Sequence, residues 1–189
     1  MRYPDTLYAP AEVDPSSRIG MAVVIGAGTR VRPFVVIYDD VSIGRNSFVG
    51  EFVHIRERTV VGDNVSIGSH CQIEGDLSIG DGTRIHGGTH VSKGARIGRR
   101  CFLANGVMFT NVRFPFATNP MYKNKLEGIT LEDDVKVGSA VVLCPGITVG
   151  HDALVGAGAV VTKDVPPYAV VIGVPGRIVG DVRDMEAYQ

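Results

Sequence analysis

The chain has 189 residues, enough for one sizeable domain. Hydrophobic residues make up 44% of it and charged residues 21%, a balance that supports a folded core and excludes a disordered polymer. The formal charge of −1, from 19 basic and 20 acidic residues, excludes a broad polycationic surface, so we expect no nucleic-acid partner.

The sequence carries no pattern that predicts insertion into a membrane or secretion. No run approaches 18 apolar residues, and the N-terminal stretch MRYPDTLYAP has no basic-then-apolar signal segment. The three cysteines are widely spaced, which argues against a disulfide framework and fits a reducing compartment. We therefore expect a cytoplasmic protein without a membrane span.

An aliphatic or phenylalanine side chain recurs every six residues through the first half of the chain. The eighteen positions of this register are Leu7, Val13, Ile19, Ile25, Val31, Ile37, Ile43, Val49, Ile55, Val61, Ile67, Ile73, Ile79, Ile85, Val91, Ile97, Leu103 and Phe109. The register resumes in a shifted frame at Leu131, Val137, Leu143, Val149, Val155 and Val161. A period of six fits neither an amphipathic helix nor a simple alternating strand.

A second column supports the repeat, because the residue four places after most of these positions is small or β-branched, as at Val65 and Cys71. Glycine often follows the aliphatic directly, as in Ile67-Gly68. We therefore predict one short strand and one corner per six residues, with both columns pointing inward. Three units would make a triangular coil of 18 residues, and coils would stack as parallel strands about 4.8 Å apart. The alternative is a β-sandwich with fortuitous spacing.

The register breaks at residues 110–130, since Phe109 and Leu131 are 22 residues apart, which is not a multiple of six. The segment contains the aromatic residues Phe114, Phe116 and Tyr122. Loops of this length in a compact domain are usually functional. We predict an excursion that leaves the solenoid and returns, and that contacts a substrate, a cofactor or another subunit.

The repeat resembles that of the hexapeptide-repeat acyltransferases. This resemblance implies an all-β fold, a left-handed parallel β-helix over residues 1–173 with a protruding loop at 110–130 and a short C-terminal tail at 174–189. The run from Gly106 to Asn111, followed by Phe114-Pro115, is similar to N-acetyltransferases that act on nucleotide-linked 3-amino sugars. Those enzymes serve surface polysaccharide biosynthesis, including O-antigen and lipopolysaccharide, which implies a UDP- or dTDP-linked amino sugar as substrate.

The stretch from Gly156 to Tyr168, and the later Gly173-Val174-Pro175-Gly176-Arg177, look like the acyl-CoA-binding end of this family. The resemblance implies acetyl-CoA as co-substrate, no metal, and a homotrimer with active sites between subunits, each walled by the loop at 110–130. The cofactor-binding candidates are Ser139, Ala140, Gly156, Ala157, Lys163 and Arg177. Lys163 and Arg177 are the candidates for the CoA phosphates, because a fixed cation suits a phosphate group.

Acetyl transfer to an amine needs an unprotonated nucleophile, a donor for the developing oxyanion and close reactants. An imidazole can accept the amine proton near neutral pH. The 18-residue coil places His54, Gln72 and His90 in one outward column. We take His86 and His90 as the lining nearest the acetyl group, either one a possible base. Both could instead be ordinary exposed histidines, with an amine that arrives neutral.

Four further residues are candidates for substrate binding. Asn105 and Asn111 flank the entrance of the loop and could orient the amine or the sugar. Arg56 and Glu74 fall one coil apart in an outward column, where we expect them to pair. They could grip sugar hydroxyls or a nucleotide phosphate, or be only a surface ion pair of little energetic weight.

Two other functions fit the same fold. A γ-class carbonic anhydrase would bind a metal with three histidines across a subunit interface, but His54 and His90 are two coils apart, too far for one metal within a subunit. A structural hexapeptide protein would use the solenoid only for assembly. Acetyl-CoA binding and bound zinc separate these alternatives from an acetyltransferase.

Overall fold

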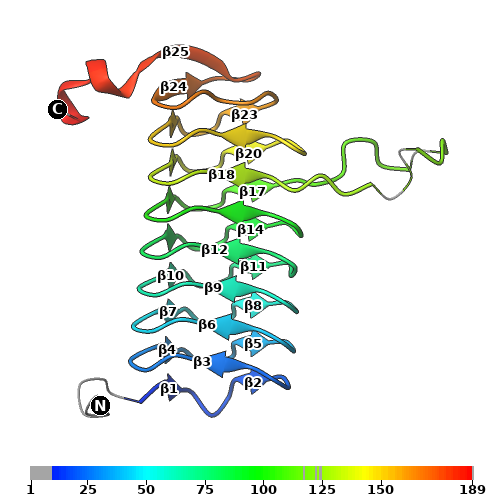
Figure 1. Cartoon of the computed structure of the whole chain (residues 1–189), viewed down its shortest axis with the longest axis vertical. Helices are drawn as coiled ribbons and strands as arrows, with labels where there is room; N and C mark the ends of the chain where they lie inside the picture. Colours follow the sequence, from blue (N-terminus) through cyan, green and yellow to red (C-terminus); the bar gives the residue numbers. More distant parts are fainter. Residues whose placement is uncertain (1–9, 117, 122, 124, 189) are drawn as a thin grey trace, which may run out of the picture.

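The computed structural model describes residues 10–116, 118–121, 123 and 125–188, and in them the chain winds as a left-handed parallel β-helix (Figure 1). Nearly every strand is two residues long, and three strands make one coil. The predicted fold class is confirmed. Leu7, the first position of the predicted register, and Tyr122 lie outside the described residues.

The strands form three sheets, which we call A, B and C. Sheet A holds β1 (Glu12–Val13), β4 (Arg30–Val31), β7 (Phe48–Val49), β10 (Ser66–Ile67), β13 (Arg84–Ile85), β16 (Phe102–Leu103), β19 (Lys136–Val137), β22 (Leu154–Val155), β24 (Ala169–Ile172) and β25 (Arg177–Asp181). Sheet B holds β2 (Arg18–Ile19), β5 (Val36–Ile37), β8 (His54–Ile55), β11 (Gln72–Ile73), β14 (His90–Val91), β17 (Met108–Phe109), β20 (Val142–Leu143) and β23 (Val160–Val161). Sheet C holds β3 (Val24–Ile25), β6 (Ser42–Ile43), β9 (Val60–Val61), β12 (Ser78–Ile79), β15 (Arg96–Ile97), β18 (Thr130–Leu131) and β21 (Thr148–Val149).

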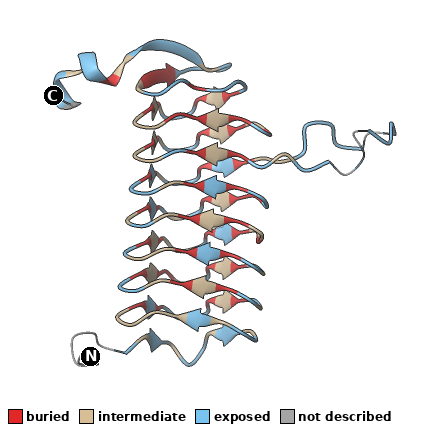
Figure 2. Ribbon diagram, viewed as in Figure 1, coloured by how far each residue is buried: buried red, intermediate tan, exposed pale blue. Residues whose placement is uncertain are grey.

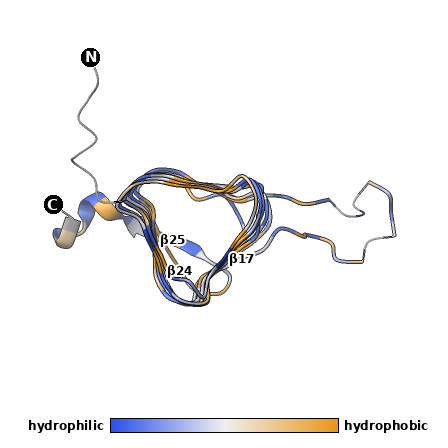
Figure 3. Ribbon diagram, turned by 90° about the horizontal axis from the view of Figure 1, so that it is seen from below, coloured by the Kyte–Doolittle hydropathy of each residue, from blue (hydrophilic) through white to orange (hydrophobic). Residues whose placement is uncertain are grey.

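The corners between the sheets run the length of the solenoid as three edges. We call them the A/B, B/C and C/A edges, after the sheets that each corner joins. Coils are numbered from the N-terminus, so that coil 1 holds β1 to β3 and coil 5 holds β13 to β15. Seen along the axis, the loop leaves one corner of a triangle and the C-terminal segment lies beyond another (Figure 3).

Residues 18 apart pair as predicted, because each strand joins the strand one coil below it. Gln72 pairs with both His54 and His90, and Ile67 pairs with both Val49 and Ile85. The two inward columns fill the core, where Ile55, Ile67 and Leu103 are completely buried. Figure 2 shows the buried positions repeating along the coils. Among the register positions that the structure describes, only those of coil 1 reach solvent, where Ile19 is 41% exposed.

Small polar residues in the second inward column bond to the corners. The Thr83 hydroxyl donates to the Gly98 carbonyl oxygen at 2.8 Å and accepts from the Cys101 amide nitrogen at 3.0 Å. A buried hydroxyl with both partners carries little desolvation cost, so threonine can replace an aliphatic residue there. Glycine after the aliphatic residue has a steric reason, since a Cβ on Gly68 would lie 2.5 Å from the Gly87 nitrogen.

The predicted excursion is confirmed. Strand β17 ends at Phe109 and β18 begins at Thr130, yet β18 pairs with β15 in the usual register, with Ile97 opposite Leu131. The intervening loop projects sideways from coil 6 (Figure 1).

Part of the stretch predicted as a C-terminal tail is a strand, since β25 pairs antiparallel with β24 on sheet A. Two short 3₁₀ helices, η1 (Val182–Asp184) and η2 (Glu186–Tyr188), follow it. In the described part of the chain, no helix is long and apolar enough to cross a bilayer.

Candidate functional site

The predicted site residues divide between two edges of the solenoid. The A/B edge carries His86 and Asn105 in coils 5 and 6, and above them Ser139, Ala140, Gly156 and Ala157. The B/C edge carries Arg56, Glu74, Asn111 and Lys163. His90 begins β14 on sheet B, between the two edges. One copy of the chain therefore does not bring all the candidates together.

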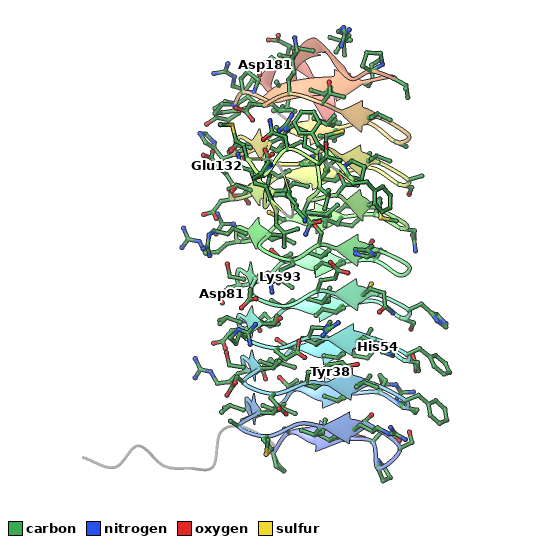
Figure 4. All side chains as sticks on the ribbon, turned by 90° about the vertical axis from the view of Figure 1, so that its right-hand side faces the viewer. Tyr38, His54, Asp81, Lys93, Glu132 and Asp181 are labelled. Carbon is green, nitrogen blue, oxygen red and sulfur yellow. The ribbon has the colours of Figure 1, made fainter. Side chains whose placement is uncertain are left out.

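A polar pocket of about 160 Å³ lies on the outer face of sheet B. It is lined by Tyr38, His54, Arg56, Gln72, Ile73, Glu74 and His90. Figure 4 shows Tyr38 and His54 on neighbouring coils of this face. The His90 Nε2 atom lies 3.4 Å from Glu74 Oε1, so a carboxylate on the coil below holds the imidazole. The Arg56 guanidinium can donate hydrogen bonds in this pocket, the Glu74 carboxylate can accept them, and Tyr38 provides an aromatic ring.

The prediction that Arg56 forms an ion pair with Glu74 was wrong. The Arg56 guanidinium bonds instead to its neighbour Glu57, with Nε 3.1 Å from Oε2, and lies 5.3 Å from the centre of the Tyr38 ring. The hydrogen bond to Arg56 lowers the pKa of the Glu57 carboxyl. Sequence spacing correctly placed Arg56 one coil below Glu74, and both line the pocket. The guanidinium bonds to the adjacent Glu57 carboxylate instead, and Glu74 contacts His90.

A second pocket, of about 190 Å³, lies around the corner on the B/C edge. Arg58 bonds to Asp76 on the coil above, and Lys93 Nζ lies 2.7 Å from the same carboxylate. These hydrogen bonds, first from Arg58 and then from Lys93, lower the pKa of Asp76 well below its usual range. Sequence reasoning missed this cluster, although Arg58 and Asp76 are 18 residues apart and therefore stacked.

His86 does not share the sheet B pocket with His90. It follows β13 on the A/B edge, where its ring packs on Phe102 at 4.8 Å between centroids. The two histidines occupy one coil, as expected, but His86 lies in the corner after β13, whereas His90 lies in sheet B. Asn105 is on the same edge, with its amide 3.4 Å from the Gly87 carbonyl oxygen, whereas Asn111 on the B/C edge donates to the Lys93 carbonyl oxygen at 3.2 Å.

The upper A/B edge presents backbone rather than large side chains. Ser139, Ala140 and Ala157 are exposed there. A Cβ on Gly106 or on Gly158 would meet nothing within 4 Å. The edge is therefore open to an extended ligand that contacts main chain.

Lys163 and Arg177 line one pocket near the C-terminal end, although 14 residues separate them. Its volume is about 210 Å³, and its walls include Val161, Val171 and Ile178. The turn between β24 and β25 carries Arg177 back over the solenoid, which brings it beside the corner that holds Lys163. The lining also includes Asp164, whose carboxylate accepts a hydrogen bond from the Thr148 amide nitrogen at 2.8 Å. A pocket with apolar walls and two cations suits a ligand that joins an apolar part to phosphate.

Across the described ranges, no three His, Cys, Asp or Glu side chains gather in a way that could hold a metal ion. Cys71 and Cys101 both stand in the second inward column, four residues after Ile67 and Ile97, and are buried in the core as that column predicts. Burial raises the pKa of both thiols.

Two models of known protein families match the chain. The bacterial transferase hexapeptide model (six repeats) matches overlapping segments from residue 22 to residue 111, and the hexapeptide repeat of succinyl-transferase matches residues 128–163. Together they cover about two thirds of the 189 residues. The chain belongs to the hexapeptide-repeat transferase family.

Similar curated proteins are named as acetyltransferases. The galactoside O-acetyltransferase of Escherichia coli K12 is 43% identical over 60 residues, covering 32% of this chain and 30% of that protein. A 2,3,4,5-tetrahydropyridine-2,6-dicarboxylate N-acetyltransferase of Staphylococcus aureus is 33% identical over 89 residues, covering 47% of this chain and 34% of that protein. The chain thus matches about a third of the length of these two relatives.

Similar solved structures share the fold. The Arabidopsis UDP-N-acetylglucosamine acyltransferase has a TM-score of 0.64 and 20% identity, covering 90% of this chain and 72% of that one. A variant of AntD, an N-acyltransferase from Bacillus cereus, was solved with dTDP-4-amino-4,6-dideoxyglucose and coenzyme A. It has a TM-score of 0.58 and 21% identity, covering 86% of this chain and 84% of that one.

Proposed function

We propose that the protein is an acetyl-CoA-dependent N-acetyltransferase that acetylates the amino group of a UDP- or dTDP-linked amino sugar. Family membership supports an acyl transfer, and AntD, an N-acyltransferase of the same fold that was solved with a dTDP-linked amino sugar, supports the substrate class. The Phe109-Thr110-Asn111 run supports a 3-amino sugar of surface polysaccharide biosynthesis. A cytoplasmic location follows as a prediction from acetyl-CoA use.

The observation that carries this proposal is the division of the candidate residues between two edges. The upper A/B edge is open main chain, while sheet B and the B/C edge hold the polar pocket and the loop. Ligand sites are usually concave and about 300–1,000 Å³ in volume, whereas the three pockets described above on one solenoid hold about 160, 190 and 210 Å³. Two copies packed side by side would set the A/B edge of one against the B/C edge of the next. We therefore propose a homotrimer with three such grooves, each walled by the loop at 110–130.

In this proposal the sheet B pocket holds the amino sugar, with Arg56 and Glu74 beside it and Asn105 and Asn111 orienting it from the two edges. The amine nitrogen attacks the thioester carbonyl carbon and passes its proton to His90, which Glu74 orients. The carbon–sulfur bond breaks, and the CoA thiolate takes the proton back from His90. His86 is the second candidate for the base, acting from the neighbouring copy's A/B edge.

The spacing of the two pockets on this side of the solenoid suits the CoA arm. His90 lies in coil 5 and Lys163 in coil 8. Three coils span roughly 14 Å at the usual strand spacing. The pantetheine arm is comparable to an extended peptide of about four residues, or roughly 14 Å. Lys163 and Arg177 would then hold the CoA phosphates, while Ser139, Ala140, Gly156 and Ala157 would contact the arm.

A panel of UDP- and dTDP-linked amino sugars, assayed with acetyl-CoA and a thiol reagent, tests the function. Saturable thiol release with one of them, and a trimer by sedimentation, are the expected results. A protein that binds no acetyl-CoA at micromolar concentration would be a structural hexapeptide protein instead. Stoichiometric zinc with carbon dioxide hydration would assign it to the γ-class carbonic anhydrases. A fully active monomer would refute the shared sites.

A further inference from the structure

The loop at 110–130 joins the solenoid through a short neck, formed by residues 111–113 on the way out and 127–128 on the way back. At its base the two chains meet, since the Glu127 amide nitrogen donates to the Asn111 carbonyl oxygen at 2.8 Å. The Arg113 guanidinium then bridges the neck, with Nη2 3.1 Å and Nε 3.2 Å from Glu127 Oε2. The ion pair is partly shielded, because the Glu127 side chain is only 20% exposed.

The same neck is fixed to the coils above and below it. Arg113 Nη2 also donates to the Pro145 carbonyl oxygen, and the Gly146 amide nitrogen donates to the Glu127 carbonyl oxygen at 3.1 Å. Below, Gly128 lies so close to coil 5 that a Cβ on it would come within 2.2 Å of the Gly94 carbonyl oxygen. One guanidinium thus ties together the outgoing chain, the returning chain and the next corner.

The part of the loop beyond the neck has a different character. Its hydrogen bonds in the described residues are local, such as those from Met121 and Lys123 to Asn119. Phe116 is fully exposed and Met121 is 73% exposed. Figure 3 shows the loop running outward from its corner, away from the sheets of its own solenoid. The exposed side chains of Phe116 and Met121 are thus free of contact with the core.

We propose that Arg113, Glu127 and the Pro145 carbonyl form a lock that aims the loop at a second copy of the chain and so positions the wall of the shared site. This inference rests on the proposed function and names positioning residues for it. A charge-assisted, bidentate contact holds direction as well as distance, which a single neutral hydrogen bond would not. The rigid neck lets the tip meet its partner without a large ordering cost at each encounter.

Arg113→Gln and Glu127→Gln test the lock, with Arg99→Gln as the matched control. Arg99 makes the same kind of contact, to Asp133 at 2.8 and 3.0 Å, on the C/A edge away from the loop. We expect the two neck variants to raise the rate of chymotryptic cleavage in the loop about fivefold or more, since cleavage follows local opening. They should also raise KM for the amino sugar about tenfold, with kcat changed less than threefold.

Arg113→Lys provides the conservative rescue. Lysine keeps the charge but reaches one acceptor at a time, so both readouts should fall between those of wild type and Arg113→Gln. Gly146→Ala attacks the lock from the other side, because its Cβ would lie 2.7 Å from Glu127 Oε2. It should reproduce the glutamine variants without removing a charge.

Three outcomes decide the proposal. Cleavage rates equal to wild type in Arg113→Gln would show that no lock exists. Faster cleavage with unchanged KM and kcat would show that the lock does not serve the reaction. If the wild-type protein transfers no acetyl group to any amino sugar, the proposed function fails, and the cleavage rates alone decide whether the lock exists.

Discussion

The C/A edge and the A/B edge have the same type of backbone corner but carry different side chains, charged on the C/A edge and small on the upper A/B edge. On the C/A edge, aspartates accept hydrogen bonds from amide nitrogens one coil below, as Asp63 does from Arg45 at 2.7 Å and Asp133 does from Arg99 at 2.8 Å. The arginine side chains then bond to the same carboxylates. The upper A/B edge instead carries Gly88, Gly106, Ala140 and Gly158 at its left-handed corner positions.

The difference separates what builds the solenoid from what is free to bind a ligand. The C/A edge satisfies its exposed backbone and charges within the chain, so a ligand would have to displace bonds that already exist. The upper A/B edge leaves its backbone uncovered, because its left-handed corner positions carry only glycine and alanine. Lower down, the same column holds Phe34, Phe52 and His70, whose rings stack at 5.2 and 4.9 Å. The open stretch therefore begins at coil 5, the coil of His86 and His90.

The largest expected effect comes from removing the proposed base. His90→Asn should lower kcat about 100- to 10,000-fold, the usual contribution of a general base, while leaving the fold intact. His151→Asn is the control, since His151 lies on the C/A edge and contacts Asp152 at 2.9 Å. Steady-state kinetics with the amino sugar measure both. If neither His90→Asn nor His86→Asn slows turnover more than about tenfold, no histidine of this pair is the base.

The two edges should also differ in what they tolerate. A Cβ on Gly98 would lie 2.6 Å from the Glu132 carbonyl carbon, so Gly98→Ala should lower the free energy of unfolding by about 1–3 kcal/mol. Ala140→Phe places on the A/B edge the residue type that Phe34 and Phe52 already have in that column, and φ there is +56°. It should leave the unfolding free energy within about 1 kcal/mol of wild type.

Ala140→Phe should nevertheless impair acetyl-CoA binding, because the ring would cover the open main chain. Urea unfolding and acetyl-CoA titration separate the two effects. Equal losses of stability at Gly98 and Ala140 would remove the distinction between the edges. Unchanged acetyl-CoA affinity in Ala140→Phe would move the CoA arm away from this edge.

The sequence predicted the fold almost completely because the repeat is a constraint on every coil. Inward positions six residues apart, such as Ile67 and Ile73, each bury a side chain, and the strand register follows from stacking residues 18 apart. The break at Phe109 was equally visible, since one interval of the wrong length interrupts a strict period. Such arithmetic says which coil a residue occupies and whether it points outward.

The same arithmetic could not choose among neighbours on the surface. It stacked Arg56 one coil below Glu74, but the rotamer of Arg56 and the adjacent Glu57 decided the contact. It put His86 and His90 on one coil, but His86 begins the four-residue corner between β13 and β14, whereas His90 begins β14 on sheet B, so the two do not line one pocket. The pocket shared by Lys163 and Arg177 depends on the antiparallel turn after β24, which lies outside the repeat.

A smaller effect on acetyl-CoA binding is expected from the cations Lys163 and Arg177, which we propose contact the CoA phosphates. Lys163→Gln or Arg177→Gln should each raise KM for acetyl-CoA about five- to tenfold, the low end for a charge-assisted hydrogen bond at an exposed site. The penalty should shrink as salt is added, because exposed charges are screened within about 8 Å at physiological ionic strength. Arg84→Gln on sheet A is the control. An unchanged KM in both variants would place the CoA phosphates elsewhere.

The smallest effect concerns the C/A edge itself and its response to acid. The backbone hydrogen bond from Arg99, followed by its side chain, lowers the pKa of Asp133. The pKa of Asp133 in the folded protein lies below its unfolded value of about 3.9. The ionised carboxylate therefore stabilises the fold at pH values above about 3.9, and this stabilisation is lost as the pH falls through the folded pKa. Asp133→Asn should therefore be less stable than wild type at pH 7, with the gap closing below about pH 4. Urea unfolding at both pH values measures it, and a gap that does not change with pH would mean that the charge of Asp133 contributes nothing to the edge.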